Sequence, residues 1–154
     1  MDSLLNEVCS PETLKQVEAK YKQEAALGQV SSETSFEYVM LLIRSRYKQD
    51  WENGLQLLKQ LYYETKDEQL KRDYTYFTAF TYCKLHEYDE AVSCCDAFLT
   101  VEPGNRQIAQ LKQHAEELKK QKMYKEAATV GGTGLALGLG LAAGAMLLSK
   151  ALKK

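Results

Sequence analysis

The chain has 154 residues, a formal net charge of −1 and 27% charged residues, which suits one modest domain. Residues 1–126 carry all 21 Asp and Glu but only 17 of the 20 Lys and Arg, and an acidic part without a basic stripe argues against nucleic acid as a partner. The four cysteines lack CxxC or zinc-ligand spacing, and the two histidines complete no catalytic motif. We therefore expect no enzyme activity, cofactor, metal site or small-molecule substrate, and we interpret the cysteines as core-filling thiols in a reducing cytosol.

Three amphipathic helices are predicted in the first half of the chain. Ser10 and Pro11 are typical of a helix cap and first helical position, and Gly28 is a natural stop. A second helix is predicted to open around residues 31–34, and a third follows it. Their apolar stripes are Leu14, Val17 and Tyr21; then Phe36, Val39, Met40, Leu42 and Ile43; then Trp51, Leu55, Leu58 and Leu61.

Three further helices are predicted after residue 67. The fourth runs roughly over residues 68–85, the fifth ends before Pro103, and Asn105 can cap the sixth. The fifth and sixth helices carry the stripes Tyr88, Val92, Cys95 and Leu99, and Ile108, Leu111, Ala115 and Leu118. With two prolines and no strand-like alternation, the fold class is all-α, a six-helix bundle.

The fourth and fifth helices match the tetratricopeptide repeat pattern at six of nine positions. The matches are Ala79, Tyr82, Leu85, Tyr88, Ala91 and Pro103, while Thr75, Thr78 and Cys95 stand where the pattern has Trp, Leu and Phe. A weaker first copy, containing Trp51 and Gly54, lies 37 residues earlier. Two tandem repeats with the first and sixth helices as caps are therefore predicted; the alternative is a generic bundle without repeats.

Residues 127–149 contain no charged residue and predict one C-terminal transmembrane helix, because 23 helical residues reach about 34 Å. The alternatives are a buried helix or a flexible Gly/Ala-rich tail. Gly134 and Gly138, and Gly140 and Gly144, have the spacing of helix-pairing motifs, so a homo-oligomer is possible. The mild hydrophobicity and the short basic tail favour a mitochondrial or peroxisomal surface. The targeting residues are Lys150, Lys153 and Lys154.

With these features, the chain resembles the mitochondrial fission 1 protein family. The resemblance rests on the six helices, the two repeats, the Gly-rich anchor and the stretches FEYVMLLIRSRY, QLKRDYTYF, KLHEYDEA and VEPGN. It implies a receptor or adaptor that promotes mitochondrial and peroxisomal fission by helping to recruit a dynamin-related GTPase, directly or through adaptor proteins. It also implies a single-pass protein of the mitochondrial outer membrane, and also of the peroxisomal membrane, with its N-terminal domain in the cytosol.

The expected organisation is an N-terminal arm (1–9), a cytosolic helical domain (10–125), the anchor (127–149) and a basic tail (150–154). Stacked repeats present a concave surface for a peptide or partner helix. The repeat register places on it Phe36, Met40, Ile43, Arg44, Tyr76, Phe80, Cys83 and Lys84. In the family the arm can lie over this groove and regulate access, which implies a regulatory role for Leu4, Leu5 and Val8.

Two other binding functions stay open on the sequence. One is a tail-anchored receptor for chaperones or for import precursors, and the other is a tether between organelles. A chaperone clamp requires several basic residues on the concave face, and only Arg44 and Lys84 are expected there. A tether would share the fold and the anchor.

Overall fold

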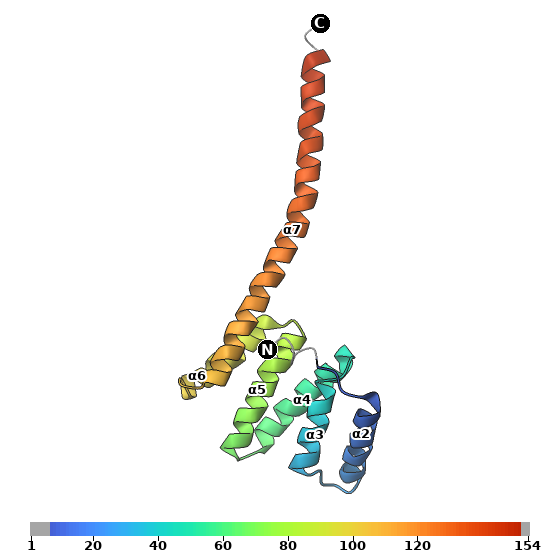
Figure 1. Cartoon of the computed structure of the whole chain (residues 1–154), viewed down its shortest axis with the longest axis vertical. Coiled ribbons are helices and arrows are strands. Elements are labelled where there is room, and N and C mark those ends of the chain that lie inside the picture. The colour runs from blue at the N-terminus through green and yellow to red at the C-terminus, as the bar shows by residue number, and fades with distance from the viewer. Residues whose placement is uncertain (1–6, 152–154) are drawn as a thin grey trace. The chain divides into compact units, whose positions relative to one another are not determined.

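The computed structural model describes the backbone of residues 7–151 and the side chains of residues 7–129 (Figure 1). Within residues 7–151 there are six helices and no strand, which confirms the all-α fold class. The helices are α2 (Pro11–Ala26), α3 (Ser32–Leu42), α4 (Lys48–Glu64), α5 (Glu68–Lys84), α6 (Tyr88–Val101) and α7 (Arg106–Ala151).

The helix ends follow the capping residues in the sequence. The side chains of Ser10, Ser31 and Asn105 each accept a hydrogen bond from a backbone N–H in the first turn of the helix that follows. Gly28 has φ +86°, in the left-handed region that glycine adopts without strain, and it ends the first helical segment as predicted. The predicted starts of α2, α3 and α7 and the predicted stop of α2 are therefore confirmed.

Helices α2 to α6 pack in chain order, each against the next, with α3/α4 and α5/α6 forming the two repeat-like hairpins (Figure 1). The small residues required between paired helices are fully enclosed. Ala79 and Ala91 have no exposed surface, and a Cβ added to Gly54 would lie 2.8 Å from Ile43 Cγ2. These close approaches confirm the repeat-like packing of both hairpins.

Helix α7 runs without interruption from the predicted sixth helix into the predicted anchor. Ile108, Leu111 and Ala115 of its first part are buried in the domain core, as their spacing predicts. By its internal contacts the chain divides into Met1–Glu117 and Leu118–Lys154. No helix among the described residues is long and apolar enough to cross a membrane, and most of the predicted spanning segment, 127–149, lies outside the residues whose side chains are described.

Candidate partner-binding surface

An aromatic cluster joins the first helices of the two hairpins. The Phe36 ring of α3 lies 5.6 Å from Phe77 and 5.8 Å from Tyr74, both on α5. Along α5, Tyr76 lies 5.2 Å from Phe77 and stacks on Phe80 at 6.5 Å. Such ring pairs contribute roughly 0.5–1.5 kcal/mol each beyond the area that they bury, so they hold α3 and α5 in a fixed relation.

A concave cavity of about 480 Å³ opens beside this cluster. Phe36, Tyr76 and Phe77 form its aromatic wall, and Asp73 and Gln107 are among the polar residues on its other sides. An apolar wall with a polar rim suits a peptide or a partner helix. We call the surface formed by Phe36, Tyr76 and Phe77 the aromatic groove.

Residues 7–9 lie against the C-terminal end of α3, next to the aromatic groove. The Cys9 backbone N–H donates to Arg44 O at 2.9 Å, and the Cys9 thiol donates to Leu41 O at 3.3 Å. The Glu7 carboxylate lies 3.8 Å from Arg44 Nε. A cavity of about 40 Å³ separates Glu7 from Tyr76, Phe77 and other side chains of the groove end.

Four of the eight residues predicted on the concave surface are partly exposed: Phe36, Met40, Arg44 and Tyr76. Of these, Phe36 and Tyr76 line the groove cavity. The other four are buried, so their predicted exposure is wrong: Ile43, Phe80, Cys83 and Lys84 are between 0 and 8% exposed. These side chains are buried because α3 and α5, which form the groove, each also pack against α4. These four residues belong to the floor beneath the surface.

Lys84 is the clearest of these corrections. Its ammonium group donates to Ile43 O at 2.6 Å and lies 4.6 Å from the centroid of the Trp51 ring. Burial lowers the pKa of this lysine, because the charged form loses its hydration. The side chain therefore ties α5 to the end of α3 inside the domain instead of orienting a ligand.

Sequence reasoning missed Phe77, which bridges Phe36 and Phe80, at 5.6 and 6.5 Å between ring centroids. Its position three residues before Phe80 on one helix was the available signal, since residues at this spacing share a face. The remaining arm residues, Leu4 and Leu5, and the targeting lysines Lys150, Lys153 and Lys154 lie outside the residues whose side chains are described. Val8 is 46% exposed.

The described residues offer little for chemistry. They contain no group of three or more His, Cys, Asp or Glu side chains that could hold a metal ion. Burial raises the pKa of Cys83 and of Cys95 to about 12, so both stay protonated near neutral pH and are poor nucleophiles. What the arrangement provides is an apolar, partly exposed surface suited to binding.

Curated relatives decide the family. The chain is 37% identical over 155 residues to the mitochondrial fission 1 protein of Mus musculus, a match that covers 100% of this chain and 98% of the relative. The chain belongs to the mitochondrial fission 1 protein family. The protein of Homo sapiens is 36% identical with the same coverage, and that of Yarrowia lipolytica is 35% identical over 146 residues.

Other comparisons agree with this membership in the mitochondrial fission 1 protein family. The family model described as the Fis1 C-terminal tetratricopeptide repeat matches residues 72–128, which include most of α5 and the whole of α6. The fold is similar to the crystal structure of Fis1 from Saccharomyces cerevisiae, with a TM-score of 0.67 and 25% identity over 78% of this chain and 92% of that chain. It is also similar to yeast Fis1 in complex with an Mdv1 fragment, with a TM-score of 0.69, 24% identity, and 77% and 91% coverage.

Proposed function

We propose that this chain is a membrane-bound receptor for mitochondrial fission, which recruits a dynamin-related GTPase directly or through adaptor proteins that dock in the aromatic groove. The observation that carries the proposal is the groove itself, a partly exposed Phe36–Tyr76–Phe77 wall beside a cavity of about 480 Å³. Family membership gives the process, and the complex of yeast Fis1 with an Mdv1 fragment gives a precedent for a protein partner. The GTPase performs the constriction, and this chain supplies its location.

The proposed location is the mitochondrial outer membrane, and also the peroxisomal membrane, with residues 1–126 in the cytosol. Residues 127–149 are the anchor, and pairing of anchors through their glycines raises the local concentration of grooves. The basic tail, residues 150–154, directs the protein to these membranes. Replacement of Lys150, Lys153 and Lys154 by uncharged residues is expected to redirect the protein to the endoplasmic reticulum; unchanged mitochondrial targeting would contradict this role.

The N-terminal arm is proposed to regulate access to the groove. The contacts of Cys9 and Glu7 with the end of α3 bring the chain to the groove margin, from which Leu4, Leu5 and Val8 can cover the aromatic wall. The test compares partner binding by the whole chain and by a chain that lacks residues 1–9. Tighter partner binding without the arm would support this regulatory role, and equal partner affinity of the two chains would contradict it.

The decisive experiment measures mitochondrial length in cells that lack this protein and are rescued with variants. Wild type is expected to restore short mitochondria, whereas Phe36→Ala/Tyr76→Ala is expected to leave elongated networks because the groove loses its partly exposed rings. Leu27→Ala is the control, since Leu27 is 80% exposed and is not part of the groove. Normal networks without any rescue would refute the fission role and favour a tether.

The chaperone-receptor alternative loses one of its two basic residues. Lys84 is 8% exposed and donates to Ile43 O, so Arg44 is the single predicted groove cation that stays partly exposed. A clamp for terminal carboxylates requires several accessible cations on one face. Arg72 also lines the groove cavity, but it pairs with Glu102, so the described residues do not provide the several available cations of such a clamp.

A further inference from the structure

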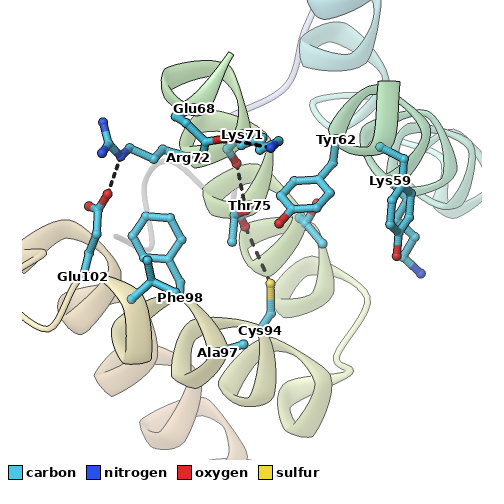
Figure 2. A pocket seen from close by; sticks show the side chains of 13 residues that line it. Lys59, Tyr62, Glu68, Lys71, Arg72, Thr75, Cys94, Ala97, Phe98 and Glu102 are labelled. Atoms are coloured by element: carbon cyan, nitrogen blue, oxygen red, sulfur yellow. Dashed lines mark hydrogen bonds and ion pairs between the residues drawn. The ribbon is translucent and has the colours of Figure 1, made fainter. Parts of the chain in front are cut away.

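A second cavity lies on a different face of α5, next to the cavity of the aromatic groove. It has a volume of about 340 Å³, is open to solvent, and is lined by residues of α4, α5 and α6 (Figure 2). On a helix with 100° per residue, Thr75 and Thr78 lie about 100° and 160° around the axis from Tyr76, and both threonines line this cavity. We call it the rear cavity.

The rear cavity exists because of two departures from the repeat pattern. Thr75 and Thr78 occupy the positions at which tetratricopeptide repeats carry Trp and Leu. A bulky residue there would extend between α4 and α6, whereas two threonines leave that space open. Figure 2 shows Thr75 between Tyr62 of α4 and Phe98 of α6, with Cys94 beside it.

The lining of the rear cavity is largely apolar. Tyr62, Tyr63, Phe98 and Val101 contribute rings and methyl groups, and Tyr63 and Val101 are 83% and 80% exposed. The polar groups of Thr75 are already used: its hydroxyl donates to Lys71 O at 2.8 Å, and its carbonyl accepts from the Cys94 thiol at 3.8 Å. What Thr75 still offers a ligand is its methyl group.

Some charged side chains at the mouth of the rear cavity have an ion-pair partner and one does not. Lys71 pairs with Glu68 at 2.8 Å, and Arg72 pairs with Glu102. Lys59 has no carboxylate within ion-pair distance among the described residues, and its ammonium lies 5.3 Å from the centroid of the Tyr82 ring. The rim therefore has one cation in excess, which favours a ligand that carries a carboxylate.

We propose that the rear cavity is a docking site for an acidic peptide segment of a partner protein. The segment inserts a Trp or Leu side chain where the repeat pattern would supply its own, and an adjacent carboxylate pairs with Lys59. A cavity of about 150 Å³ admits benzene, so 340 Å³ has room for an indole ring and a neighbouring aliphatic group. Buried aromatic anchors with a charged rim are the usual centre of a binding hot spot.

This site is separate from the groove of the proposed fission function. Phe98 and the ion pair between Arg72 and Glu102 line both cavities and so form the partition between them. The inference does not depend on the role of Phe36 and Tyr76. A partner bound to the rear cavity leaves the aromatic groove available to a second segment.

The test uses the whole chain in lipid nanodiscs, with ¹³C-labelled threonine methyl groups, titrated with the probe acetyl-Glu-Trp-Leu-Asp-amide. The methyl signals of Thr75 and Thr78 are expected to shift and saturate, while that of Thr13 on α2 stays constant. A probe with Ala in place of Trp and Leu is expected not to bind. A probe with Lys in place of Glu and Asp is expected to bind about fivefold more weakly, because it cannot form the partly exposed ion pair with Lys59.

Variants of the chain test whether the probe binds in the rear cavity and not elsewhere on the domain. Thr75→Trp/Thr78→Leu fills the cavity and is expected to abolish binding while the thermal midpoint is unchanged or higher. If that variant does not fold, Lys59→Glu provides the test, because it changes a surface charge and is expected to weaken binding of the acidic probe. Phe36→Ala/Tyr76→Ala is the matched control and is expected to bind as wild type.

Three results would overturn the proposal. One is that folded Thr75→Trp/Thr78→Leu binds the acidic probe with wild-type affinity. If this variant does not fold, the corresponding result is wild-type affinity of Lys59→Glu for the probe. Another is a loss of binding in the control variant, which would assign the probe to the aromatic groove. The third is equal affinity for N-acetyl-tryptophanamide and the peptide, which would make the cavity a site for small apolar molecules instead.

Discussion

The close approach of α3 and α4 predicts an unusual response to Gly54→Ala. Alanine in place of a helical glycine normally stabilises a protein by about 1 kcal/mol. Here the added methyl group would lie 2.8 Å from Ile43 Cγ2 and 3.3 Å from Leu42 Cβ. Ile43 is fully buried and its β-branched side chain has little rotamer freedom, so the methyl group cannot be accommodated by a side-chain rotation.

The magnitude follows from these two opposing effects. Overpacking of a core costs about 1–3 kcal/mol, which exceeds or cancels the propensity gain and leaves a net loss of about 0–2 kcal/mol. Removal of the opposing methyl group should reverse the sign. In an Ile43→Ala background, Gly54→Ala is expected to stabilise by about 1 kcal/mol, so the coupling between the two sites is at least about 1 kcal/mol.

The assay is urea unfolding of the four chains of this double-mutant cycle, followed by the fluorescence of Trp51, the single tryptophan. Trp51 lies on α4 itself, so its signal reports the hairpin under test. Stabilisation by Gly54→Ala of about 1 kcal/mol in both backgrounds would refute the close packing of α3 on α4. The first repeat-like hairpin would then be more open than described.

Three further predictions concern the same domain and use the same assay. Burial raises the pKa of Cys83 from 9.0 to about 12, so the unfolded chain loses this thiol proton first as the pH rises. The free energy of unfolding should therefore fall by about 1.4 kcal/mol per pH unit above pH 9, and Cys83→Ala should remove that part of the slope; equal slopes would contradict this. Ser31→Ala, which removes the cap of α3, should cost about 1 kcal/mol, whereas Ser32→Ala in the next position should be nearly neutral. Leu58→Ala, at a fully buried position, should cost about 2–5 kcal/mol; a loss below about 0.5 kcal/mol, as for an exposed leucine, would refute its place in the core.

The sequence alone determined the helical fold class and the starts of several helices, although the predicted sixth helix and the predicted anchor form one continuous helix, α7. Ser10, Ser31 and Asn105 cap helices in the structure because short-range hydrogen bonds depend on neighbours in the chain. The small residues Gly54 and Ala91, 37 positions apart, marked the two helix contacts that the fold requires. Local chemistry and repeat spacing are properties of a linear chain, and so the all-α repeat architecture could be predicted.

Only the tertiary structure decided which side of each helix remains accessible. Periodicity shows that Tyr76, Phe80 and Cys83 share a face of α5, but it cannot show how far the neighbouring helices cover that face. Tyr76 stays partly exposed, while Phe80 and Cys83 are 5% and 2% exposed. The rear cavity at Thr75 also arises from three helices that meet in space. Exposure is a property of packed neighbours, which a helical period does not contain.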